Sequence, residues 1–190
     1  MTGTVWNLDE STGELLVKTG VTGRAARMGH RLTIAMDSWR AEVTWAAGEP
    51  TEVDLSVEVS SLRVVRGEGG VKGLSAPEKA VVRSNAMKSL DADRFPQIRF
   101  RTNDIQQADD GYRLTGTLEV HGKTRERVVD VQVEERDDVW RISCDADVCQ
   151  TEFGIKPYSI LMGSVKIADT VTVSFTAQRP KDTAQRPKDS

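Results

Sequence analysis

The chain has 190 residues, a length that predicts one domain with a short tail. Hydrophobic residues make up 38% of it, and together with the 15 glycines they reach the range of globular proteins, which excludes wholesale disorder. Its 26 basic residues are outnumbered by 29 acidic ones, for a net charge of -3, which argues against nucleic acid as a partner because a phosphate backbone requires a basic surface.

No segment reaches the roughly 18 consecutive apolar residues of a membrane-spanning helix, so no integral membrane segment is expected. The first ten residues contain neither the basic nor the apolar region of an export signal. We therefore expect a soluble, cytoplasmic protein.

Most of the chain alternates apolar and polar residues, the period-2 pattern of half-buried antiparallel strands. In chain order, the segments with this pattern or with strand composition are 14–19, 31–37, 39–45, 53–59, 98–100, 118–120, 129–133, 139–148, 165–167 and 171–175.

One segment departs from the strand pattern. Ser75-Ala-Pro77-Glu78 has the spacing of a capping box, in which the serine caps a helix and the glutamate three residues later bonds back to it. Apolar residues follow at spacing four, at Val82, Ala86 and Leu90. The sequence predicts an α-helix near residues 76–90 that covers an edge or a mouth of the sheet.

Short turns at 108–111, 121–124 and 134–138 predict a four-stranded meander from residue 97 to 148. A sheet that turns back repeatedly removes its exposed edges by closing on itself. We expect a mainly β fold, a closed up-and-down antiparallel β-barrel of about eight strands, which has room for one small ligand. A two-sheet sandwich fits the same pattern.

Residues 178–190 differ from the rest of the chain. Ala-Gln-Arg-Pro-Lys-Asp occurs twice near the end, from Ala177 and from Ala184, and the segment lacks large aliphatic residues. We expect residues 1–177 to form the barrel domain and residues 178–190 to form a disordered tail.

Large apolar side chains at inward positions are candidates for lining a pore. The residues we expect to contact a ligand are Trp39, Phe100, Leu118, Trp140, Ile142, Phe153, Tyr158, Leu161 and Phe175. Sequence parity alone does not decide which strand face lies inward.

Basic residues in glycine- or proline-containing loops are candidates for contact with a polar head group, since arginine binds carboxylate or phosphate in bidentate geometry. Arg24, Arg27 and His30 lie in one such loop, and Lys156 lies in another. The glycine spacing around them does not match a nucleotide-binding loop.

The sequence offers little for catalysis or metal binding. Its two histidines, His30 and His121, and its two cysteines, Cys144 and Cys149, lack the spacing of a zinc site. The cysteines would lie on opposite faces of one strand, too far apart for a disulfide. We expect no metal, no cofactor, no catalytic residue and two buried thiols.

Several stretches resemble the YceI-like family of polyisoprenoid-binding, lipocalin-like proteins, in the manner of an actinobacterial-type branch. They are Trp6-Asn-Leu-Asp9, Leu90-Asp-Ala-Asp-Arg-Phe95-Pro96-Gln-Ile98-Arg-Phe100, the segment 112–124 with its Gly122-Lys123-Thr124 end, Phe153-Gly154-Ile155, and the segment 162–171. The chain departs from the family at Glu10-Ser11-Thr12, where other members carry a His-Ser pair.

The resemblance implies an elongated barrel with a helix across it, an apolar pore holding an isoprenoid or other long-chain lipid, and a homodimer. Carriage or storage of such a lipid, without turnover, is the function it predicts. Two alternatives remain open at this point. One is an enzyme acting on a bound lipid with His30 as acid and base, and the other is an interaction protein whose pore is filled by its own side chains.

Overall fold

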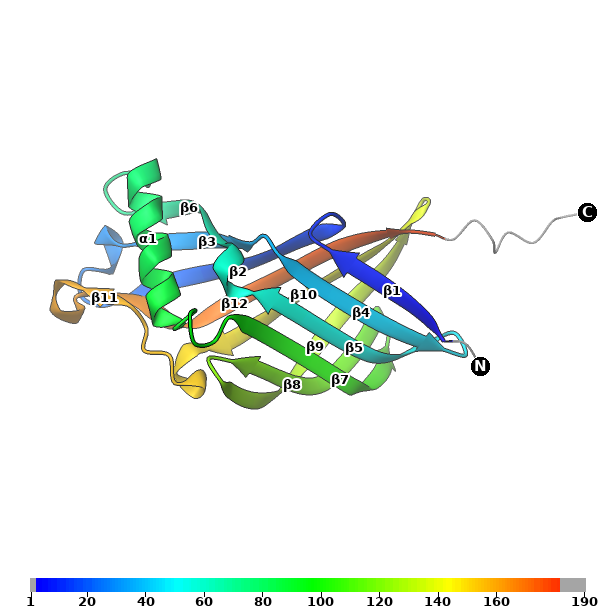
Figure 1. Cartoon of the computed structure of the whole chain (residues 1–190). Coiled ribbons are helices and arrows are strands. Elements are labelled where there is room, and N and C mark those ends of the chain that lie inside the picture. The colour runs from blue at the N-terminus through cyan, green and yellow to red at the C-terminus, as the bar shows by residue number, and fades with distance from the viewer. Residues whose placement is uncertain (1–2, 182–190) are drawn as a thin grey trace, which may run out of the picture.

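The computed structural model describes residues 3–181 of the chain. Its backbone forms one antiparallel sheet that curls around an interior, with a single α-helix across one end (Figure 1). The elements are β1 (Thr4–Asp9), β2 (Gly13–Thr22), β3 (His30–Met36), β4 (Trp39–Ala46), β5 (Glu49–Glu58), β6 (Leu62–Gly69), α1 (Ala76–Ser89), β7 (Gln97–Ala108), β8 (Gly111–Val120), β9 (Lys123–Arg136), β10 (Val139–Cys149), β11 (Ser159–Ile160) and β12 (Val165–Pro180). Short 3-10 turns occupy Ala26–Met28 (η1), Val59–Ser61 (η2), Gln150–Phe153 (η3) and Leu161–Gly163 (η4).

The hydrogen-bonded strands follow the order β1-β4-β5-β7-β8-β9-β10-β12-β2-β3-β6, and β11 pairs with β12. Strands β7 to β10 are consecutive neighbours, which confirms the predicted meander. A single curled sheet also excludes the two-sheet sandwich. No helix within residues 3–181 is long and apolar enough to span a bilayer.

The mainly β barrel class is confirmed, although the sheet has twelve strands and not about eight. The strands that the sequence pattern did not indicate are β1, β6 and β11. Strand β11 has two residues, and β6 ends in glycines, so neither shows a sustained alternation. Two of the predicted segments, 165–167 and 171–175, belong to the single long strand β12.

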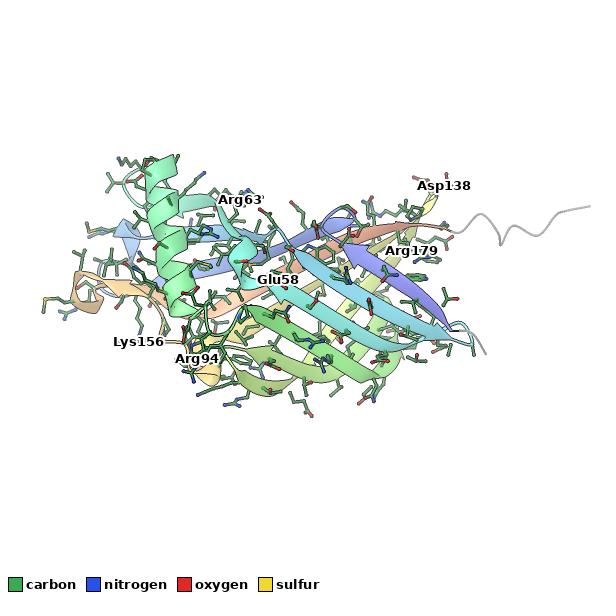
Figure 2. The ribbon with its side chains drawn as sticks, in the orientation of Figure 1. Glu58, Arg63, Arg94, Asp138, Lys156 and Arg179 are labelled. Atoms are coloured by element: carbon green, nitrogen blue, oxygen red, sulfur yellow. The ribbon has the colours of Figure 1, made fainter. Side chains whose placement is uncertain are left out.

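Contacts between β1 and β12 help to bring the sheet round on itself. The Arg179 guanidinium of β12 lies 4.5 Å from the centre of the Trp6 ring on β1, a cation–π distance. In the turn after β1, the carbonyl of Thr12 accepts a hydrogen bond from the Gln178 amide at 2.8 Å. Figure 2 shows Arg179 at the end of the barrel opposite α1.

Helix α1 begins with the predicted capping box. The hydroxyl of Ser75 accepts from the Glu78 amide at 3.4 Å, and the Glu78 carboxylate accepts from the Ser75 amide at 2.7 Å. Lys79 and Arg83 donate from the helix to the carbonyls of Val65 and Leu62, both on β6. The helix therefore covers the edge strand of the sheet, as the sequence predicted, and satisfies backbone acceptors that the edge leaves unpaired.

The interior is filled with side chains where α1 crosses it. Leu32, Ile34, Met36, Trp39 and Leu62 are at most 9% exposed there, and Val82, Ala86, Met87 and Leu90 of the helix segment pack against their cluster. A smaller cluster joins Val120, Phe153 and Ile155. The helix end of the barrel is thus a packed core and not a pore.

Strand β12 runs to Pro180, three residues into the segment expected to be a tail. The amide of Lys181 donates to the carbonyl of Asp138 at 2.8 Å, in the turn between β9 and β10. Residues 182–190 lie outside the described part of the chain, so the prediction of a tail stays a prediction.

The capping box gives a first testable prediction. Replacing Ser75 by alanine removes the side chain that caps the first turn of α1, and we expect a loss of about 0.5–2 kcal/mol in the free energy of unfolding. Urea denaturation followed by circular dichroism measures it. The matched control is Ser84→Ala, an exposed serine within the same helix, which should change stability by less than about 0.5 kcal/mol. Equal effects of the two substitutions would contradict the proposed contribution of the cap.

Candidate functional site

The half of the barrel away from α1 contains an apolar cavity of about 390 Å³. Its walls are formed by inward side chains of β1, β2, β4, β5, β7, β8, β9, β10 and β12. These side chains belong to Trp6, Leu8, Leu15, Ala41, Val43, Trp45, Pro50, Val53, Leu55, Phe100, Ile105, Tyr112, Leu114, Leu118, Val129, Val131, Val133, Ile142, Cys144, Ala146, Val148, Val173 and Phe175. The volume lies within the range of small-molecule sites.

Strand alternation places these groups. On β9 the odd positions 129, 131 and 133 are half-buried, whereas Asp130 and Gln132 between them are exposed. On β10 the even positions, including Ile142, Cys144 and Ala146, lie inward. Valine and alanine predominate in this stretch of the wall, and because they are smaller than the core residues beneath α1 they leave the interior unfilled.

The cavity reaches the surface between β9 and β10. These strands pair only from Arg136↔Val139 to Gln132↔Ser143. Beyond that point β9 continues to pair with β8, and β10 continues to pair with β12, but no ladder joins them. Five consecutive residues of each strand line the cavity here, namely 127–131 and 144–148. Because side chains alternate along a strand, these sets include outward-facing residues as well as inward-facing ones. We call this gap the side opening.

The sequence explains why the ladder stops. Continued at the same register, it would place Asp145 directly opposite Asp130, and like charges facing each other across a strand pair destabilise it. A charge-assisted pair with Arg113, at 2.7 Å, lowers the pKa of Asp130, so this carboxylate remains ionised at neutral pH. The side chains of Asp145 and Asp147 accept hydrogen bonds from Ser174 and Thr172 on β12, away from β9.

One end of the side opening is bounded by the 3-10 turn η3. Arg127 of β9 forms an ion pair with Glu152, and its guanidinium lies 5.3 Å from the centre of the Phe153 ring. The ring nitrogen Nδ1 of His121 donates to the Phe153 carbonyl at 3.1 Å. Because η3 follows β10 directly, these contacts tie the end of β10 to β9 and to the β8–β9 turn.

Three aromatic rings lie together at the end of the cavity away from α1. The rings of Trp6 and Trp45 are 4.4 Å apart between centres, and Tyr112 meets Trp45 edge-on at 6.3 Å. A bulge in the β4–β5 ladder pairs Trp45 with Pro50, so that both line the cavity. The indole nitrogen of Trp45 is buried without a hydrogen-bond partner within the described residues, a desolvation cost that this cluster bears.

A family model described as the YceI-like domain matches residues 6–179. The chain belongs to the YceI-like family. The structure is similar to crystallised BcnA of Burkholderia cenocepacia, with a TM-score of 0.68 and 16% identity over 90% of this chain and 99% of that one. It is also similar to the Campylobacter jejuni YceI protein that crystallises with large solvent channels, with a TM-score of 0.58 and 13% identity over 78% of this chain and 84% of that one. No curated protein matches the chain.

The YceI-like barrel brings four of the nine predicted lining residues to the cavity, namely Phe100, Leu118, Ile142 and Phe175. The other five lie elsewhere. Trp39 is in the core, edge-on to Phe175 at 5.0 Å between ring centres, and Trp140 borders a separate depression beside the β7–β8 turn. Phe153 is fully buried in the smaller cluster, and Tyr158 and Leu161 are 42% and 58% exposed. The phenolic oxygen of Tyr158 accepts a hydrogen bond from Asn85 of α1 at 3.0 Å.

The predicted head-group residues do not line the YceI-like cavity. Arg24 and Arg27 are exposed between β2 and β3, and His30 Nε2 donates to the Lys72 carbonyl at 2.7 Å. Lys156 is exposed and lies near the lower end of α1 in Figure 2. The packed core separates these residues from the cavity, because both loops connect strands at the helix end of the barrel.

Valines, alanines and acidic residues of the cavity were not among the sequence candidates. The sequence candidates were chosen for their large side chains, whereas an interior remains hollow where its side chains are small. That Asp130 and Asp145 would face each other becomes evident only once the β9–β10 register is known. Within residues 3–181, no cluster of three or more potential metal ligands occurs.

Both cysteines of the YceI-like chain are free thiols, and Cys144 lines the cavity. Burial, with a smaller contribution from Asp145, raises the pKa of Cys144 to about 11. A thiol with this pKa is about 0.1% thiolate at pH 8 and reacts slowly.

We therefore predict slow alkylation of Cys144. In a Cys149→Ser variant, the rate of labelling by iodoacetamide, followed by mass spectrometry, should rise about tenfold per pH unit between pH 8 and 10. Unfolding in urea should raise the rate at pH 8 by at least about tenfold, since it removes the burial. A pH profile that levels off near pH 8.5 would contradict the burial of this thiol.

A third prediction concerns the backbone at the side opening. Amides of β9 and β10 that face it have no ladder partner, so they should exchange hydrogen with solvent faster than the amides of β8, which pairs on both sides. Amide exchange measured by NMR compares them, with residues 132–136 of β9 as a control within the same strand. Equal protection along all of β9 would show that the two strands are joined throughout.

Proposed function

We propose that the protein binds a long amphiphilic lipid, of the polyisoprenoid, quinone or fatty-acid-like kind, and carries or stores it without turnover. The observation that supports this most directly is the apolar cavity of about 390 Å³ within the barrel. Membership of the YceI-like family, matched over residues 6–179, supports the same conclusion.

The volume bounds how much of the lipid is enclosed. A water molecule occupies about 30 Å³ in the liquid, so 390 Å³ corresponds to roughly thirteen water-sized or methylene-sized groups. At ~0.8 kcal/mol per buried methylene, these contribute about 10 kcal/mol, from which the costs of association subtract several. We expect dissociation constants in the micromolar range or weaker for a guest of this length. A longer chain would extend beyond the cavity.

The charges at the cavity indicate how such a guest lies. Among the lining residues within 3–181, Arg127 is the sole cation, and its partner is Glu152. The acidic residues Asp130, Asp145 and Asp147 surround the side opening. The wall therefore favours a hydrocarbon tail inside the barrel and disfavours an anionic head group at the side opening, because like charges repel.

The two alternatives gain no support from the geometry. An interior filled by the protein's own side chains is found in the half of the barrel beneath α1 but not in the half that contains the cavity. An enzyme that uses His30 would need this histidine at the bound lipid, whereas His30 bonds to Lys72 outside the cavity. A homodimer and a cytoplasmic location stay predictions.

The proposal predicts that filling the cavity abolishes binding. Ala146 is an inward residue of β10, and Ala146→Phe should weaken binding of the uncharged fluorophore 1-N-phenylnaphthylamine at least tenfold, because the new ring occupies the space of the guest. Fluorescence titration measures the dissociation constant.

The matched control is Thr117→Phe, which adds the same ring at an exposed, outward position of β8 and should bind as the wild type does. An organic extract of the wild-type protein, isolated rapidly at a concentration well above the expected dissociation constant and analysed by mass spectrometry, should contain about one amphiphile per chain. Equal binding by the two variants, together with an extract free of lipid, would refute the proposed function.

A further inference from the structure

We propose that the lipid enters and leaves sideways, through the side opening between β9 and β10, and that the Arg127–Glu152 ion pair controls how readily the opening widens. This inference rests on the proposed function, because it assigns a route to the guest of that cavity. The family match and the fold do not by themselves indicate a route.

The helix end of the barrel gives no passage. Buried residues of β3, β4 and β6 fill it, with Leu32 at 9%, Trp39 at 3% and Leu62 at 3% exposure. Helix α1 packs over them, and Lys79 and Arg83 hold it to β6 through hydrogen bonds of 2.7 and 2.8 Å to backbone carbonyls. A guest passing here would have to displace the core of the protein.

The opposite end is covered by aromatic rings. Trp6 and Trp45 are in ring contact, Tyr112 meets Trp45 edge-on, and the Arg179 guanidinium lies over Trp6. These groups come from β1, β4, β8 and β12, so opening this end requires several strands to move together.

The side opening needs less rearrangement. Its rim includes Val128, which is 56% exposed and yet lines the cavity, so the apolar interior and the solvent meet at this residue. No ladder joins β9 and β10 next to it, so widening the gap breaks no backbone hydrogen bond between them. Continued pairing at the same register would bring Asp130 and Asp145 face to face, which disfavours closure of the gap by a ladder.

The Arg127–Glu152 ion pair spans the end of this gap. The Arg127 side chain is only 22% exposed and also packs against the ring of Phe153, which is fully buried. Because Glu152 belongs to η3 and η3 follows β10, separating β9 from the end of β10 must break this pair. The pair therefore acts on the width of the opening without contacting the guest through Glu152, which does not line the cavity.

Kinetic measurements distinguish a residue that controls the route from a residue that binds the guest. The guest passes the same barrier in both directions, so a change in the barrier alters the association and dissociation rates by the same factor and leaves the dissociation constant unchanged. A change in guest contact alters the dissociation constant.

The first test is Glu152→Ala, studied by stopped-flow fluorescence with 1-N-phenylnaphthylamine. We expect both rates to rise about two- to fivefold, the range for loss of a partly exposed ion pair, with the dissociation constant within twofold of the wild type. The matched control is Glu126→Ala. Glu126 is an exposed glutamate beside Arg127 on the same strand, and its loss should leave both rates unchanged.

The second test closes the opening. Asp145→Lys places a cation where a continued ladder would bring a second carboxylate against Asp130, which favours continued pairing of the strands, and both rates should fall roughly three- to tenfold. Thermal unfolding of each variant verifies that the barrel remains folded.

Opposite changes in the two variants, each shared by association and dissociation, would support the side route. Wild-type rates in both variants, or a change confined to dissociation in Glu152→Ala, would overturn it. If the wild-type protein fails to bind the fluorophore and its organic extract contains no lipid, then the proposed function itself is wrong, and this result is seen before any variant is made.

Discussion

Backbone hydrogen bonding between neighbouring strands is the constraint on which this structure depends. A curled sheet satisfies its amides and carbonyls only while each strand has a neighbour on both sides. The chain meets this requirement around most of the barrel and covers the edge strand β6 with α1. It fails to meet it at β1, which within residues 3–181 pairs with β4 alone, and, beside the cavity, between β9 and β10, where continued pairing would bring two aspartates face to face. The candidate site is found at that interruption.

Stability and binding are divided between the two halves of the interior. Leucine, methionine and tryptophan side chains from β3, β4 and β6 fill the half beneath α1, where the helix adds further apolar contacts. Valine and alanine lining β9 and β10 leave the other half hollow. A guest can therefore be exchanged in one half while the other retains its packing, which explains how a small barrel remains folded with an unfilled interior.

The charges that residues 3–181 contribute at the site disfavour an anionic head group, and none of them is placed to attract one without competition from a neighbouring residue. The acidic rim consists of residues whose carboxylates have partners on neighbouring strands, namely Arg113, Ser174 and Thr172. Arg127, the cation among the lining residues, forms an ion pair with Glu152. Under the proposed function, affinity comes from apolar burial, and we propose that the polar groups influence which end of the guest lies outside and how fast it exchanges.

The sequence alone determined the strand class, the meander from β7 to β10 and the capped helix, because these follow from period-2 alternation and from a local capping motif. It left the helix over an edge or a mouth of the sheet, and the contacts with β6 decided for the edge. It also identified four lining residues, among them Phe100 and Leu118. Tertiary structure decided which face of each strand lies inward and which half of the barrel is filled, since both depend on strands far apart in the chain. The side opening depends on register in the same way, because Asp130 and Asp145 are ordinary exposed residues until the register of the short β9–β10 ladder is known, and only then is it evident that continued pairing would place them opposite each other.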